Sequence, residues 1–142
     1  MNHLGRDHFK AYSAGSHPRG EVHPMTLEVL MRQSYDVGNL RSKSWTEFAA
    51  PDAPFMDFVF TVCDQAAGEV CPAWPGQPIT AHWAFADPAA VIGDREQQHK
   101  AFSASQFQIA NRIRLFLSLP IEKIDRISLQ TTLRELAQRR DE

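Results

Sequence analysis

Cysteine is scarce in this sequence, because the 142 residues contain only two, Cys63 and Cys71. Two cysteines cannot build the framework of several disulfides that stabilises many small secreted proteins. A strong excess of one charge is also absent, since 15 basic and 17 acidic residues leave a net charge of −2. This balance gives no reason to expect nucleic acid or an anionic membrane as a main partner.

Long apolar runs are missing as well. No stretch approaches the length of a membrane span, and the opening residues MNHLGRDHFK lack the apolar core of a signal peptide. We therefore expect a cytoplasmic protein, in a compartment whose reducing conditions disfavour a permanent disulfide. The composition, with 43% hydrophobic and 23% charged residues, is typical of one globular domain with its own core.

Hydrophobic patterning predicts three strands separated by helices. Strands are expected at residues 8–13, at 55–62 and, more briefly, at 78–85. The second, FMDFVFTV, is dense in aromatic and β-branched residues and reads as the best buried strand.

Helices are expected over about residues 25–34 and 96–118. Pro120 ends the second, and one or two further helical turns follow it. The inner face of the long helix is expected to carry Phe102, Ile109, Ile113 and Phe116. Strands that alternate with helices predict an α/β fold with a parallel sheet.

Polar residues follow each expected strand. They are the stretch Ser13-Ala14-Gly15, Cys63 and Asp87. Function in parallel sheets concentrates in the loops at the carboxyl ends of the strands, so we expect all three at one edge. Asp87 precedes Pro88, and because Asp-Pro is also a common turn or helix cap, a purely local role is the alternative.

The two cysteines lie eight positions apart within TVCDQAAGEVCPAWPG, residues 61–76. They could take part in redox chemistry, form a structural disulfide, bind zinc or remain inert as small buried hydrophobic groups. Their spacing is not C-x-x-C, and His82 would still need a fourth partner to complete a zinc site, so no metal is predicted. The residues by themselves leave the other roles open.

Three stretches resemble one known family: AYSAGSHPRGEVHP, FVFTVCDQAAGEVCPAWPG and HWAFADPAA. Their motifs Y-S-A-G, V-C-D-x-A-A-x-x-x-C-P and H-W-x-x-x-D-P, in this order, are similar to those of the thioredoxin-coupled arsenate reductases. These enzymes share the fold of the low-molecular-weight protein tyrosine phosphatases. The resemblance runs from about Leu4 to Leu119. It implies a three-layer α/β/α fold with a parallel sheet.

The resemblance also implies roles for three residues. Cys63 matches the second redox cysteine, which attacks a cysteine–arsenic adduct so that arsenite leaves. Cys71 matches the third, which ends paired with Cys63 in a disulfide that a thioredoxin-type protein reduces. Asp87 matches an acid that protonates a leaving oxygen in the phosphatases. No cofactor is implied.

The family's nucleophile loop, C-x-x-x-x-x-R-S, has no match, because no cysteine precedes Cys63. The opening MNHLGRDHF resembles the tail of a helix that ends at Gly5. We therefore expect the family's first, central strand and its anion loop to be absent. Residues 1–119 are then a truncated phosphatase-like domain, and residues 120–142 a C-terminal helical extension packed on it.

These expectations combine into one functional hypothesis. The chain is an arsenate reductase-like protein, inactive by itself, whose partners are a thioredoxin-type reductant and, with the missing loop restored, arsenate. Neither nucleic acid nor a membrane is expected as a partner. A homodimer through exposed strand edges is expected, because the central strand is missing. The alternatives are a phosphatase relative and a non-enzymatic remnant that acts as a binding or regulatory module.

Overall fold

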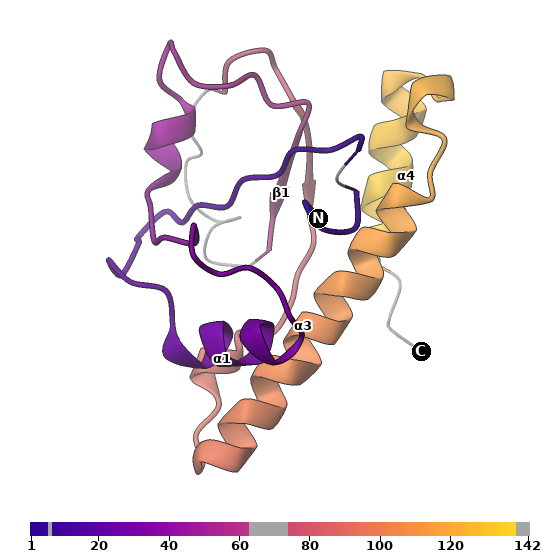
Figure 1. Cartoon of the computed structure of the whole chain (residues 1–142). Helices are drawn as coiled ribbons and strands as arrows, with labels where there is room; N and C mark the ends of the chain where they lie inside the picture. Colours follow the sequence, from indigo (N-terminus) through magenta and orange to yellow (C-terminus); the bar gives the residue numbers. More distant parts are fainter. Residues whose placement is uncertain (6, 63–73, 139–142) are drawn as a thin grey trace.

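The structure is a computed structural model that describes residues 1–5, 7–62 and 74–138. The helices and strands in this part of the chain are, in order, α1 (Pro24–Arg32), η1 (Trp45–Phe48), β1 (Phe58–Thr61), β2 (Ile79–His82), η2 (Pro88–Ala90), α3 (Arg95–Leu117), η3 (Ile121–Lys123) and α4 (Arg126–Gln138). The η elements are 3-10 helices. Helix α3 is the longest of all these elements, and Figure 1 shows α1 near its first half and α4 near its last turns.

The sheet in the described residues consists of β1 and β2, which pair in parallel. Phe58 lies opposite Ile79, and the register runs to Thr61 opposite His82. The N–H of Ile79 donates to the Asp57 carbonyl at 3.0 Å. The expected strands at 55–62 and 78–85 are thus found, each shorter than expected, and the α/β class with a parallel sheet is confirmed.

Helix α3 begins at a capping box. The Asp94 carboxylate accepts from the N–H of Gln97 at 2.8 Å, and the Gln97 side chain accepts from the N–H of Asp94 at 2.9 Å. At the other end the Ser118 hydroxyl donates to the Leu115 carbonyl at 2.7 Å, two residues before Pro120. The helix over about 96–118 is confirmed within one residue at each end.

The main hydrophobic core lies between the sheet, the end of α3 and α4. Phe116 of α3 and Leu133 of α4 are completely buried. Phe60 and Trp83 stack with ring centroids 4.0 Å apart, and the ring of Phe116 meets that of Phe60 edge-on at 5.3 Å. The buried members of this main core are Ile79, Ala81, Trp83, Phe116, Leu129, Leu133 and Leu136. Burying one such side chain contributes about 1.5–3 kcal/mol, so this cluster dominates the stability of the fold.

A second, smaller cluster joins α1 to the first half of α3. Its buried residues are Met25, Val29 and Phe102. His23 caps α1 by accepting the N–H of Met25 at 3.1 Å, and its ring lies 4.6 Å from that of Phe102. One histidine side chain therefore both starts α1 and fixes it against α3.

The predicted strand at residues 8–13 is wrong. These residues are not in a strand, and the nearest ladder contact is one isolated parallel bridge between Gly15 and Ser44. A strand needs a neighbouring strand to pair its backbone groups, and here the N–H and carbonyl of Ala11 bond instead to the Asn2 side chain. Its amide donates to the Ala11 carbonyl at 2.9 Å and accepts from the Ala11 N–H at 2.7 Å.

The chain approaches α3 closely at Gly5. The N–H of Gly5 donates to the Met1 carbonyl at 2.8 Å and closes a single turn. A Cβ at this position would stand 2.9 Å from a methyl carbon of Leu117, so a larger residue here would require the Leu117 side chain to shift. Within the described residues, no helix combines the length and the apolar character needed to cross a membrane.

Candidate functional site

The last rung of the sheet carries a polar pair at its carboxyl edge. The Thr61 hydroxyl and Nδ1 of His82 are 2.7 Å apart, partly buried, and face each other across β1 and β2. Just beyond, the N–H of Trp83 donates to the Thr61 carbonyl at 2.7 Å, and that of Phe85 donates to the Val62 carbonyl at 3.1 Å. The pairing of the two chain segments therefore continues past the strands and brings Val62 beside Phe85.

A buried arginine of α3, Arg112, packs against two aromatic rings next to this edge. Arg112 is only 4% exposed, and its guanidinium carbon lies 5.1 Å from the Phe85 ring centre and 5.9 Å from that of Trp83. Aromatic faces attract a cation in this geometry. Sequence reasoning missed this residue. The sequence feature that could have indicated its burial is its position directly before Ile113, next to the apolar stripe expected on α3.

Asp87 follows β2 and begins η2. Its Oδ1 accepts from the N–H of Ala89 at 2.9 Å, so the carboxylate caps this short helix and is exposed to solvent. The local role that the Asp-Pro sequence also predicted is therefore present. Pro88 stands at the first helical position, where its missing N–H costs nothing.

The Ser13-Ala14-Gly15 stretch bonds to the loop before η1. The N–H of Gly15 donates to the Lys43 carbonyl at 3.0 Å, and the Gly15 carbonyl accepts from the N–H of Trp45 at 3.0 Å. Ser13 itself is exposed. These bonds hold the stretch beside residues 43–45.

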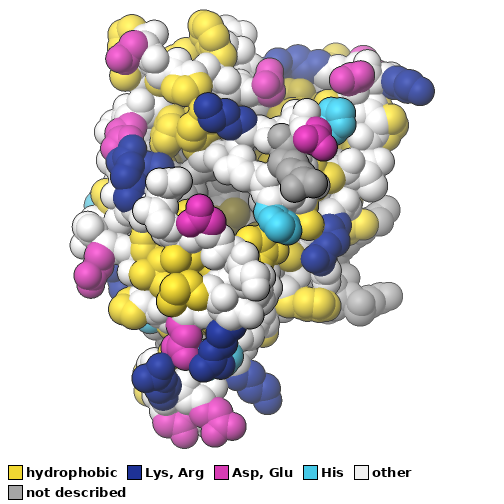
Figure 2. Space-filling model, in the orientation of Figure 1, with side chains coloured by type: hydrophobic (Ala, Val, Ile, Leu, Met, Phe, Trp, Pro, Cys, Tyr) yellow, Lys and Arg dark blue, Asp and Glu magenta, His cyan; other side chains and the backbone are white. Residues whose placement is uncertain are grey.

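Cys63 and Cys71 lie outside the described residues, so the structure does not test their predicted roles. In the described ranges, no three His, Cys, Asp or Glu side chains come together in a way that could hold a metal ion. Figure 2 shows acidic and basic side chains interspersed over one face of the molecule, without a continuous patch of either sign.

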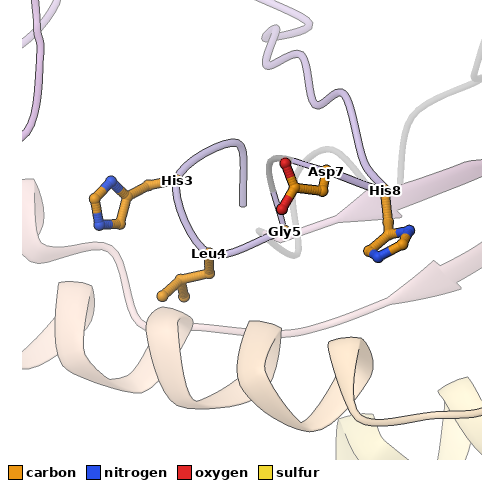
Figure 3. A pocket seen from close by; sticks show the side chains of 5 residues that line it. All are labelled: His3, Leu4, Gly5, Asp7 and His8. Atoms are coloured by element: carbon orange, nitrogen blue, oxygen red, sulfur yellow. The ribbon is translucent and has the colours of Figure 1, made fainter.

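The pocket at the first turn has a volume of about 400 Å³ and is lined by residues 3–5, 7 and 8. Figure 3 shows that the side chains of His3 and His8 point away from one another, and that Asp7 is directed at neither. The His3 ring instead packs edge-on against Tyr35, with centroids 5.0 Å apart. These side chains do not converge on a common point, so the pocket offers no catalytic or metal-binding set.

A cavity of about 300 Å³ lies between the first turn, α1 and α3. Most of its wall is apolar, and Val29, Leu30 and Ile109 are among the residues that line it. It contains none of the residues singled out at the carboxyl edge of the sheet. The polar side chains at the sheet edge run from Thr61 and His82 to Asp87.

Comparison with known proteins places these features in a family. Residues 1–126 match the model of the family described as low molecular weight phosphotyrosine protein phosphatase. A protein of Halalkalibacterium halodurans named arsenate reductase is 32% identical over 110 residues, which cover 78% of this chain and 76% of that protein. The arsenate reductase of Bacillus subtilis is 31% identical over the same shares. That of Bacillus licheniformis is 31% identical over 80% of this chain and 78% of its own length. The chain belongs to the low molecular weight phosphotyrosine protein phosphatase family.

Proposed function

We propose that this chain is an arsenate reductase-like protein that carries the second and third thiols of a thiol–disulfide relay, Cys63 and Cys71. One observation carries the proposal. Cys63 follows Val62 directly, at the carboxyl end of β1, in a chain whose arsenate reductase relatives align with up to 80% of it. Loops at this end of a parallel sheet are where α/β proteins place their reactive groups.

The chemistry balances as two thiol exchanges. The Cys63 thiolate attacks the sulfur of a cysteine–arsenic(V) adduct, the S–As bond breaks, and arsenic leaves with the electron pair as arsenite. The Cys71 thiolate then attacks Cys63 in the resulting disulfide and releases the first thiol. Two thiols are oxidised to one disulfide while arsenic gains two electrons, and a thioredoxin-type dithiol returns those two electrons.

Asp87 is proposed as the acid of this site. An exposed carboxyl group two residues after Phe85 lies on the segment that pairs with the end of β1. From there it can give a proton to an oxygen leaving the arsenic or phosphorus atom. We place the reaction in the cytoplasm, because a relay of free thiols requires reducing conditions.

The thiol relay is tested by mild oxidation of the folded protein. Mass spectrometry is expected to show an intramolecular Cys63–Cys71 disulfide, and thioredoxin with its reductase and NADPH is expected to reduce it. The Cys71→Ser variant is the matched control, because it leaves a single thiol and can form no internal bridge. Two free thiols after oxidation of the parent protein would overturn the relay.

Catalytic turnover of arsenate needs more than these two thiols. Residues 1–142 contain no C-x-x-x-x-x-R-S sequence and no cysteine before Cys63, so the first thiol and the anion cradle must come from elsewhere. We expect the 142-residue chain alone neither to reduce arsenate nor to hydrolyse p-nitrophenyl phosphate. Rapid arsenate reduction by pure protein would contradict this expectation. Phosphatase activity would favour the reaction after which the family is named.

A further inference from the structure

We propose that helix α1 is a pH-sensitive latch, which is docked on α3 while His23 and His99 are neutral and is released when these two side chains take up protons. The two histidines contact opposite ends of α1. His23 directly precedes the first residue of the helix, and His99 of α3 contacts Arg32, its last residue. The inference does not depend on the proposed function, because it involves neither cysteine.

The contact made by His23 requires a neutral ring. Its Nδ1 accepts the N–H of Met25 at 3.1 Å, and a ring nitrogen that carries a proton cannot accept a hydrogen bond. Protonation would therefore remove the cap of α1 and place a positive charge at the helix N-terminus, the end at which the helix dipole disfavours cations. The Phe102 ring packs against the His23 ring, but it supplies no acceptor that could replace the lost cap.

The contact made by His99 has the same requirement. One terminal nitrogen of the Arg32 guanidinium lies 3.1 Å from Nε2 of His99. Arginine can only donate, so Nε2 must accept and cannot carry a proton. A protonated His99 would instead bring two cations to hydrogen-bond distance of each other. Both ends of α1 are thus held by imidazole nitrogens that act as acceptors.

The charged groups in direct contact with this end of α1 carry more positive than negative charge. The Glu28 carboxylate accepts from Arg32 at 2.8 Å and from Arg95 at 3.0 Å, so two guanidinium groups already share one carboxylate. A further cation at His99 adds repulsion. Among the described residues, neither histidine is hydrogen-bonded or ion-paired to the other charged groups of the loop before α1, of η2 or of the first half of α3, which are Arg19, Glu21, Asp87, Asp94, Glu96 and Lys100.

The rest of the interface between α1 and α3 is small. Its buried residues are Met25, Val29 and Phe102, and the cavity of about 300 Å³ has Val29 and Phe102 in its wall. Atoms that line an unfilled space lack packing partners on that side. Ser34, just after the helix, has a φ of 63°, a conformation that glycine adopts more easily. Few buried contacts and a strained end are typical of an element that opens locally.

The direction of the pH effect follows from the number of bound protons. Docked α1 keeps protons off two imidazole nitrogens, whereas released α1 leaves both free to bind them. Stability rises with pH wherever the open state binds more protons. The docked state is therefore favoured above the ordinary histidine value of about 6.5 and is lost as the pH falls below it.

Hydrogen–deuterium exchange of the whole chain, read by mass spectrometry, tests the latch. Protection factors, which correct for the intrinsic pH dependence of exchange, are compared at about pH 7.5 and about pH 5.5, on either side of the histidine range. We expect protection of α1, residues 24–32, to fall about tenfold, since a lost cap is usually equivalent to about fivefold and the His99 contact adds to it. Helix α4, which lies at the other end of α3 and contains no histidine, should keep its protection (Figure 1).

Two substitutions keep the acceptors and remove the titration. His23→Asn retains a good capping side chain, and His99→Gln retains an oxygen that can accept from Arg32. In the double variant, protection of α1 should be nearly the same at both pH values. His8→Gln is the matched control, because it removes an exposed histidine outside α1 and α3 and should leave the pH dependence of the parent protein intact.

Two results would overturn the latch. One is a loss of protection in α1 that is no greater than the loss in α4, which would indicate global unfolding or no response. The other is a loss in the double variant as large as in the parent protein, with folding checked by circular dichroism. If the double variant fails to fold, the single variants decide, and a loss equal to that of the parent in both of them overturns the proposal.

Discussion

The two halves of this molecule are held together differently. Among the described residues, the buried members of the main core all come from β2 and the chain after it, with Phe116 and Leu133 completely enclosed. In residues 1–57, apart from residue 6, the buried hydrophobic side chains are Met25 and Val29. Besides the small cluster that joins α1 to α3, the N-terminal half has separate local contacts, such as the two hydrogen bonds between Asn2 and Ala11 and the bridge at Gly15.

This difference shows what a β-type sequence requires in order to become a strand. FVFT at 58–61 forms one because β2 pairs with it along the whole register. Residues 8–13 have no ladder of this kind: the Asn2 side chain bonds to Ala11, and the N–H groups of His8 and Phe9 donate to the Gly5 carbonyl. Alternating apolar residues favour a β-strand, but the strand forms only where a neighbouring strand pairs with it.

The largest effect is expected from a cavity in the main core. Leu133→Ala should lower the free energy of unfolding by about 2–5 kcal/mol, because the site is completely enclosed. Val29→Ala, in the smaller cluster, removes two methyl groups and should cost about 1–2 kcal/mol, at about 0.8 kcal/mol for each buried carbon. Urea denaturation measures both. Equal losses would mean that the two clusters form one cooperative core.

The next prediction concerns the open side of β1. This apolar strand has β2 as its hydrogen-bonded neighbour in the described residues, whereas its composition is typical of a strand flanked on both sides. We predict a homodimer through the edge of β1 that faces away from β2, detected by sedimentation velocity. Val59→Lys should convert it to monomer, because a charge on an edge discourages pairing.

Thr80→Lys is the control for that experiment. Thr80 is exposed on β2, opposite Val59, so the change adds the same charge and leaves the edge of β1 intact. The variant should remain a dimer. A monomeric parent protein, or a dimer that persists in Val59→Lys, would show that the edge of β1 is not the interface.

The smallest expected effect is on the loss of stability at low pH. Hydrogen bonds from the N–H and the hydroxyl of Ser128, at 3.0 and 2.7 Å, lower the pKa of Asp125 at the start of α4. Its stabilising contribution is present above the ordinary carboxyl pKa of about 3.9 and is lost as the pH falls through the lower, folded value. Asp125→Asn should therefore flatten the acid limb of a plot of urea midpoint against pH.

Glu47 is the matched carboxyl group in the N-terminal half. Hydrogen bonds from the Arg41 guanidinium, at 2.8 and 2.6 Å, lower its pKa as well. Because its surroundings carry so little buried surface, Glu47→Gln should leave the global urea midpoint unchanged at every pH. An acid limb that flattens equally in both variants would indicate that the two halves unfold as one unit.

The sequence predicted α3 well for a local reason, whereas α4, with 13 residues, is longer than the one or two turns expected after Pro120. Asp94, Gln97 and Pro120 mark the ends of α3, and the spacing of Phe102 and Phe116 marks its inner face, so short-range information sufficed. The same kind of local signal, Asp before Pro, indicated the capping role of Asp87, which the structure shows, whereas its acid role was implied by the family resemblance. The contacts of Asp87 with its own chain neighbours do not test the acid role.

Features that depend on distant partners were missed. The absence of a strand at residues 8–13 depends on Asn2, and the burial of Arg112 depends on two rings that lie 29 and 27 positions earlier in the chain, Trp83 and Phe85. The pairing of Thr61 with His82 likewise depends on the register of the sheet, which no local pattern specifies.

The indole of Trp83 has a practical consequence. It is 3% exposed, and its Nε1–H donates to the Leu133 carbonyl of α4 at 3.2 Å, whereas Trp45 and Trp74 are more open and meet edge-on, with centroids 6.2 Å apart. The chain thus contains its own optical probe. In the double variant Trp45→Phe/Trp74→Phe, which keeps one tryptophan, fluorescence would come from Trp83 alone, and its emission wavelength would report the separation of α4 from the sheet.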